Sequence, residues 1–174
     1  MPSSGAIEKA RLYAGPFLLI REVPGMEIRP ARVADRDAIL SLTDRFAEFA
    51  LPAWRTQDEI NAGTRRHVER ALAAPSDSSE VLVALDDGRV VGFAWMLVVQ
   101  DFYRGVDVAK LSEIAVLEDG KGIGSALMSE AEAWARTRHL SILVLNVMSG
   151  NARARRLYEH RGFAPEYTMM AKPL

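Results

Sequence analysis

Residues Val116–Leu127 read Val-Leu-Glu-Asp-Gly-Lys-Gly-Ile-Gly-Ser-Ala-Leu and are the most informative segment of the chain. It follows an apolar run and opens a segment with helical periodicity, so it predicts a strand, a glycine-rich turn and the start of a helix. Its glycines can adopt positive φ and let a ligand approach the backbone. The first amides of the helix have no intrahelical acceptor and lie at the positive end of the helix dipole. Together with the positive charge of Lys121, these features indicate a site for a phosphate group.

The spacing of the glycines by itself is less specific. It is G-x-G-x-G, which fits neither the G-x-G-x-x-G dinucleotide fingerprint nor the P-loop pattern that ends in Gly-Lys-Ser/Thr. A glycine-rich turn that only lets the helix pack closely on a sheet is therefore an open alternative at this point.

Length and composition set the class of protein. The 174 residues suffice for one domain with a substantial core, and the net charge of −1 gives no field that attracts nucleic acid. The absence of cysteine excludes disulfides, thiolate metal sites and a cysteine nucleophile. The spacing of the three histidines, His67, His139 and His160, is not that of metal ligands, so we expect no bound metal ion. No apolar run has the length of a membrane span, and we expect a cytoplasmic protein.

The periodicities along the chain predict the element order β-α-α-β-β-β-α-β-α-β. This is an α/β fold with a central mixed sheet and helices on both of its faces. The expected strands are residues 27–29, 80–85, 89–99, 108–116, 141–147 and 167–172. The expected helices begin after the N-cap Asp35, after the capping box of Thr56 and Glu59, at the glycine turn and after the N-cap Asn151. The helix at the glycine turn is expected to bury the stripe Ile123, Leu127, Ala131 and Trp134. With the strands on either side it predicts a parallel crossover unit. Residues 1–25 match no regular element, and we treat them as an N-terminal extension before a domain of residues 26–174.

Strict alternation in the strand before the glycine turn assigns its side chains to two faces. Leu111, Glu113 and Ala115 are expected on one face, and Lys110 and Ser112 on the other.

A second segment, Asn151–Phe163, makes the interpretation more specific. Its pattern of Asn, Ala three residues later, Leu-Tyr and Gly-Phe resembles the N-x-x-A-x-x-L-Y-x-x-x-G-F segment of the GNAT family of N-acetyltransferases. In that family the upstream partner is a strand followed by R/Q-x-x-G-x-G/A, and Asp119–Gly124 fills this frame. The one departure is Asp119 at the usual Arg or Gln position. We expect its carboxylate and that of Glu118 to face solvent.

The resemblance implies acetyl-CoA as the acetyl donor and a primary amine as the acceptor. It places the CoA pyrophosphate on the amides of the glycine turn. The pantetheine arm would pair with the strand before the turn, as an added strand does. Asn151 would hold the amides of that arm. The donor-binding residues expected on this basis are Ala115, Val116, Gly120, Lys121, Gly122, Ile123, Gly124, Ser125, Asn151 and Ala154.

The same resemblance suggests two catalytic residues. Tyr158 matches the tyrosine that lies near the thioester sulfur in the family, where a protonated phenol can give a proton to the departing thiolate. Glu113 is the candidate base for the substrate ammonium, and transfer would then be direct. Tyr158 as a packing aromatic and Glu113 as a solvated or paired carboxylate are the competing interpretations. Ser112 and Ser125 stay open as nucleophiles.

The acceptor is the part that the sequence leaves most open. Trp54 and Asn146 are candidates for its binding site, although Asn146 equally fits a cap at the end of a strand. We expect a small-molecule amine. The alternatives are a protein amine, an aminoacyl-tRNA, which the near-neutral charge disfavours, and a non-catalytic acyl-CoA-binding module. Family members often pair through their sheets, so a homodimer is compatible with the resemblance.

Overall fold

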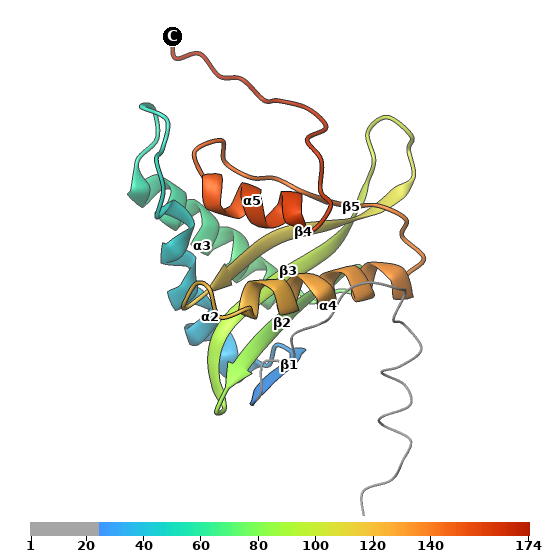
Figure 1. The fold of residues 1–174 in the computed structure, drawn as a ribbon. Helices are drawn as coiled ribbons and strands as arrows, with labels where there is room; N and C mark the ends of the chain where they lie inside the picture. Colours follow the sequence, from blue (N-terminus) through green and yellow to red (C-terminus); the bar gives the residue numbers. More distant parts are fainter. Residues whose placement is uncertain (1–24) are drawn as a thin grey trace, which may run out of the picture.

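The structure, a computed structural model, describes residues 25–174, so the predicted N-terminal extension up to Pro24 lies outside it. Its centre is a five-stranded sheet in the order β1-β2-β3-β4-β5, in which the first four strands are antiparallel and β5 is parallel to β4 (Figure 1). The strands are β1 (Met26–Pro30), β2 (Ser79–Asp86), β3 (Arg89–Gln100), β4 (Asp107–Val116) and β5 (Leu143–Leu145).

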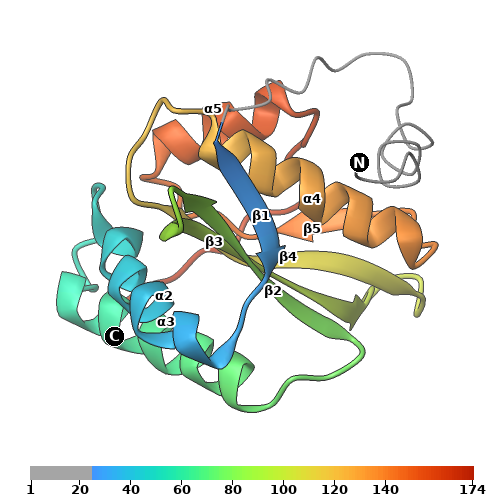
Figure 2. The same cartoon turned by 90° about the horizontal axis from the view of Figure 1, so that it is seen from below.

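Helices cover both faces of this sheet. The helices α2 and α3 lie on one face, and α4 and α5 lie on the other (Figure 2). This arrangement confirms the predicted α/β class with a mixed sheet. Short 3-10 segments precede and follow α2. The helical elements are η1 (Val33–Asp35), α2 (Arg36–Leu42), η2 (Thr43–Ala47), α3 (Gln57–Ala73), α4 (Ile123–Thr137) and α5 (Ala152–His160).

Each face has its own apolar core. Ile39, Leu40 and Val68 of the first two helices pack with Phe93 of β3 on one side. On the other side the predicted α4 stripe is buried against the sheet, namely Ile123, Leu127, Ala131 and Trp134. The parallel pairing of β4 with β5 across α4 is the predicted crossover unit.

Local signals in the sequence also mark where elements begin and end. The amide of Glu59 donates to Thr56 Oγ1 at 3.2 Å and the amide of Thr56 donates to Glu59 Oε2 at 2.9 Å, which is the predicted capping box of α3. Asp87 and Gly88 both have positive φ in the turn between β2 and β3. Gly162 ends α5 with φ +86°.

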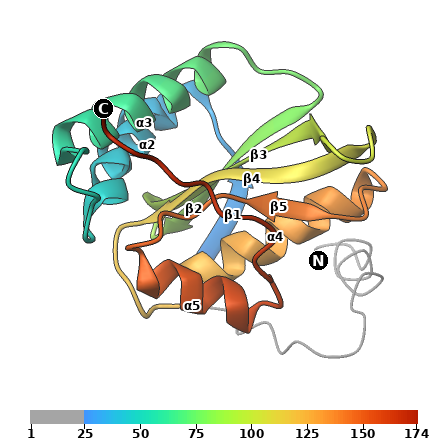
Figure 3. The same ribbon diagram turned by 90° about the horizontal axis from the view of Figure 1, so that it is seen from above.

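The predicted last strand, residues 167–172, is wrong. The chain after α5 has no regular structure, runs away from the sheet and leaves Tyr167, Met169 and Met170 exposed (Figures 1 and 3). β5 is also only three residues long, against the seven expected. Alternation of side chains favours a strand only where a neighbouring edge supplies hydrogen bonds, and this tail does not reach one.

The role predicted for Asp35 as the cap of the first helix is also wrong. Its carboxylate accepts from the guanidinium of Arg29 at 2.7 and 3.0 Å and from the amide of Arg32 at 2.7 Å, and it makes no cap bond to α2. The bonds to Arg29 and Arg32 lower the pKa of Asp35, whose side chain is almost buried. The pair therefore fastens β1 to the start of α2.

Removal of this carboxylate should destabilise the fold. Asp35→Ala removes the acceptor of three hydrogen bonds, two from Arg29 and one from Arg32, and is expected to lower the free energy of unfolding by about 2 kcal/mol. Because the folded pKa of Asp35 is depressed, the wild-type advantage is complete above the ordinary carboxyl pKa and is lost as the pH falls through the folded value. Urea unfolding at neutral and acidic pH measures this. Asp37→Ala, which removes a carboxylate that is 95% exposed, is the matched control. Equal stability of the two variants would contradict the assignment.

Candidate functional site

Strands β4 and β5 separate where the glycine turn approaches. Their ladder joins Ala109 to Leu143, Lys110 to Val144 and Leu111 to Leu145, and it ends there. From Ser112 to Val116, β4 is paired in the sheet with β3 alone. The backbone edge at Ala115 and Val116, where the sequence placed an added strand from the donor, is thus free of β5.

A β-bulge in β4 assigns the side chains of this region to their faces. Trp95 of β3 pairs with Glu113 and the next residue, Met96, pairs with Leu111, so Ser112 is the extra residue. Leu111 consequently joins the core under α4, and the expectation that it shares a face with Glu113 is wrong. The inserted residue interrupts the alternation of β4 side chains between the two faces of the sheet, on which that expectation was based. Glu113 and Ala115 do share a face, as predicted, and it is the one covered by α2 and α3.

The glycine turn leaves a row of amides at the start of α4. Gly120 and Gly122 have φ of +77° and +79°, and no side chain caps the helix at Gly122. The amide of Ala126 makes the first intrahelical bond, to the Gly122 carbonyl at 3.0 Å. The amides of Ile123, Gly124 and Ser125 precede it and are free for a ligand. A Cβ built at Gly120 would meet nothing within 4 Å, so the approach to the turn is open.

The acidic residues before the turn, Glu118 and Asp119, are exposed to solvent as expected, and each also forms an ion pair. Asp119 forms an ion pair with Arg153 of α5 and lies 3.5 Å from Arg45 of η2. Arg45 also donates to the carbonyl of Leu117. Lys121 is paired with Glu118 at 2.7 Å. An anion thus stands at the usual Arg or Gln position of the family frame, and it contacts two arginines beside the turn.

Ion pairs and hydrogen bonds hold helix α5 at both of its ends, and they position Tyr158. Arg153 holds its first turn through Asp119, while Arg161 at its end donates to Ser129 Oγ at 3.0 Å and to Glu132 Oε1 at 2.7 Å. Asn151 caps the helix by accepting from the amide of Ala154 at 3.0 Å, which leaves its side-chain N–H groups for other partners.

Glu113 and Tyr158 are the two strongly perturbed groups near the separated strands. Burial raises the pKa of Glu113 to about 7, against an opposing effect from the charge of Lys110. Burial, reinforced by the charge of Glu113, raises the pKa of Tyr158 to about 12. The phenol is therefore protonated at neutral pH, while Glu113 is close to the midpoint of its titration. Such a pair is suited to donate and accept protons.

Sequence reasoning missed a cluster on the Glu113 face of the sheet. The ring of His67 in α3 lies 4.6 Å from that of Trp95, and His67 Nε2 is 3.4 Å from Ser112 Oγ. The indole N–H of Trp95 donates to Ser79 Oγ at 2.8 Å. One signal was available: His67 follows Ile60 by seven residues, on the inward stripe of the helix.

The predicted acceptor residues lie in two neighbouring loops. Trp54, 47% exposed, is in the loop after η2, and Asn146 is exposed directly after β5. The carbonyl oxygen of Ala50 lies against Gly150, so these loops meet. A part in acceptor binding stays a prediction for both residues.

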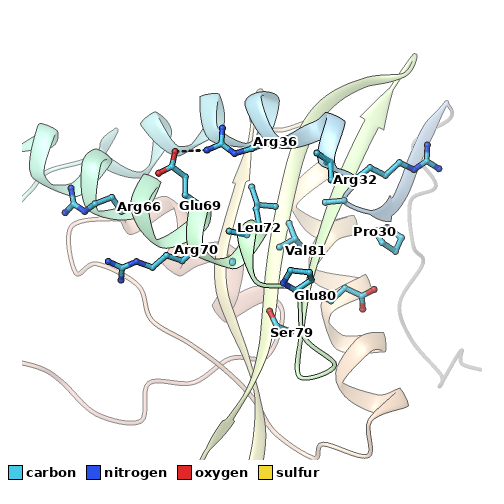
Figure 4. A pocket seen from close by; sticks show the side chains of 15 residues that line it. Pro30, Arg32, Arg36, Arg66, Glu69, Arg70, Leu72, Ser79, Glu80 and Val81 are labelled. Carbon is cyan, nitrogen blue, oxygen red and sulfur yellow. Dashed lines mark hydrogen bonds and ion pairs between the residues drawn. The ribbon is translucent and has the colours of Figure 1, made fainter.

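A separate groove of about 700 Å³ lies between α3, the start of α2 and the β1–β2 edge (Figure 4). It contains none of the predicted site residues. In the described residues, 25–174, no group of three or more His, Asp or Glu side chains is placed to hold a metal ion. Within the same part of the chain, no helix is long and apolar enough to span a membrane.

Comparison with known proteins defines the class. The family model of the acetyltransferase (GNAT) family matches residues 41–163. The chain is 27% identical over 146 residues, 79% of its length and 89% of the relative's, to the uncharacterized N-acetyltransferase YhfO of Bacillus subtilis (strain 168). It is also 27% identical to a putative acetyl transferase structure from Pyrococcus furiosus, with a TM-score of 0.68 over 86% of this chain and 99% of that one.

The aminoglycoside N-acetyltransferase AAC(6')-Iy, whose structure is in complex with CoA, has the same fold at 19% identity. Its TM-score is 0.63, over 85% of this chain and 94% of that one. The protein belongs to the acetyltransferase (GNAT) family and is an acetyltransferase.

Glu113→Gln should change how stability depends on pH. Because burial raises the folded pKa of Glu113 from 4.5 to about 7, the folded state holds a proton that the unfolded state has already lost. The contribution of Glu113 to wild-type stability therefore falls as the pH rises from about 4.5 to about 7 and is level above that. Glu113→Gln lacks this loss and is expected to be the more stable protein at pH 8, by urea unfolding. Glu130→Gln, at an exposed position of α4, is the control. A stability difference that is the same at pH 5 and pH 8 would argue against a buried, titrating Glu113.

Proposed function

We propose that this acetyltransferase uses acetyl-CoA to acetylate the primary amine of a small molecule by direct attack. The proposal rests on two groups near the point where β4 and β5 separate. Glu113 has a pKa of about 7 and can act as a base, and the phenol of Tyr158 is protonated at neutral pH. We take the domain that performs it to be residues 26–174, because β1 begins at Met26.

The residues around the glycine turn fit the donor. Free amides at Ile123, Gly124 and Ser125 and the open approach at Gly120 suit a diphosphate. Arg153 and Arg45 lie nearby, paired with Asp119. The free edge of β4 at Ala115 and Val116 offers backbone hydrogen-bonding groups to the pantetheine arm of acetyl-CoA. When bound, acetyl-CoA supplies an activated acetyl group as a thioester.

The protein's own groups move the protons. Glu113 removes a proton from the substrate ammonium, which frees the lone pair of the nitrogen to attack the thioester carbonyl carbon. Tyr158 donates its proton to the sulfur as the carbon–sulfur bond breaks. The phenolate then takes the second proton from the nitrogen as the amide forms, and Glu113 releases its proton to solvent. The products are the N-acetyl compound, the CoA thiol and one proton.

The variant Tyr158→Phe tests donor binding and catalysis separately. Acetyl-CoA is expected to raise the melting temperature of both the wild type and Tyr158→Phe, since a ligand of the native state stabilises it. In a thiol-release assay with a panel of amines, Tyr158→Phe should lower kcat about 100-fold because the proton donor is lost. Tyr103→Phe, in an exposed loop, is the control and should be active. No melting shift with the wild type, or full activity of Tyr158→Phe, would refute the mechanism.

The rate should report the ionisation of Glu113. For the wild type, kcat/KM for the amine is expected to fall below an inflection near pH 7, because only the ionised carboxylate accepts the proton. In Glu113→Gln the rate should be about 100-fold lower and should rise continuously with the fraction of free amine. Steady-state rates between pH 5.5 and 9 measure this. An unchanged inflection in the variant would assign the base to another group.

A further inference from the structure

We propose, building on the function above, that the acceptor carries a carboxylate as well as its amine, and that Lys110 binds this carboxylate beside Glu113. The substrate class is then the amino carboxylates, and polycationic amines are poor acceptors. The inference rests on the side chains that share the α3-covered face of β3 and β4.

The bulge places Lys110 on the same face as the proposed base. Lys110 pairs with Leu97 of β3, and Glu113 pairs with Trp95, two residues earlier on that strand. Side chains two residues apart on a strand point to the same side, about 7 Å apart. In a regular strand without the bulge, their separation of three positions would put Lys110 and Glu113 on opposite faces.

Neighbouring groups complete a small set of donors around Lys110. Ser112 Oγ and His67 Nε2, 3.4 Å apart, lie on this face with Trp95 as an apolar wall. Burial lowers the pKa of His67, with further effects from the charges of Lys110 and Arg70. His67 is accordingly neutral at pH 7 and offers a hydrogen bond rather than a charge. A carboxylate on the acceptor can bind the ammonium group of Lys110 and accept hydrogen bonds from Ser112 and His67.

The surrounding charge favours an anion. Among the ion pairs of residues 25–174, none involves Lys110 or Arg70, the two cations whose charges act on His67. The carboxylate of Glu69, next to Arg70 on α3, turns to Arg36 at 3.2 Å and so does not pair with Arg70 (Figure 4). This surplus of positive charge attracts a carboxylate and repels a second ammonium group on the acceptor.

The simpler alternative is that Lys110 is a solvated lysine that only lowers the pKa of Glu113. Its removal would then slow the reaction of every amine by the same factor. Such an effect cancels in the ratio of kcat/KM for an amino carboxylate to kcat/KM for a matched amine that lacks the carboxylate. This ratio is therefore the quantity to measure.

The acceptors are glycine, β-alanine, 4-aminobutyrate and 5-aminopentanoate. Each is compared with the amino alcohol in which CH₂OH replaces the carboxylate, and spermidine serves as the polycation. Thiol release is followed at saturating acetyl-CoA. For the wild type, the best amino carboxylate is expected to exceed its amino alcohol at least 10-fold in kcat/KM.

Lys110→Gln should reduce that ratio about 10- to 100-fold, mainly through the KM of the amino carboxylate, while the KM of acetyl-CoA is unchanged. Lys110→Arg, which keeps the charge, should restore the ratio to within about threefold of the wild type. Lys172→Gln, in the exposed tail, is the control.

The inference is overturned if the wild type uses amino alcohols or spermidine as well as amino carboxylates. It is equally overturned if Lys110→Gln leaves the ratio unchanged. Absence of thiol release with every amine would instead refute the proposed function itself, so the two failures are distinguishable.

Discussion

One inserted residue in β4 governs the site. The bulge at Ser112 lies just beyond the last β4–β5 pair, so the strand changes its side-chain register at the same place where it loses its parallel neighbour. Ahead of the bulge, Leu111 is part of the core under α4. Beyond it, Glu113 and Ala115 face α2 and α3. The proposed roles of Glu113 and Lys110 both depend on this one change of register.

A second constraint is the fastening of α5. This short helix has few apolar side chains of its own, and none of its residues is fully buried. Arginines at its two ends tie it to the glycine turn and to α4, through Asp119 and through Glu132 with Ser129. Charge-assisted bonds of this kind add geometric specificity as well as energy. Asp119, which departs from the family frame, thereby becomes the residue that links the turn to the helix that carries Tyr158.

The site was partly visible in the sequence because its local features are encoded locally. Glycines at 120 and 122, the cap at Asn151 and the stripe of α4 are determined by residues within a few positions of one another, and all three appear as expected. The partners of Asp119 and the contact of His67 with Trp95 join segments far apart in the chain. No short-range pattern specifies such contacts, so they were not predicted.

Periodicity, caps and two spaced motifs act over short distances, so the residues alone predicted the fold class, the family and the order of the strands and α-helices up to α5. Only the tertiary structure decided the length of β5, the irregular path after Phe163 and the face on which each β4 side chain lies. Strand length and register depend on the hydrogen bonds that a neighbouring strand supplies, and that neighbour is specified by the packing of the whole sheet.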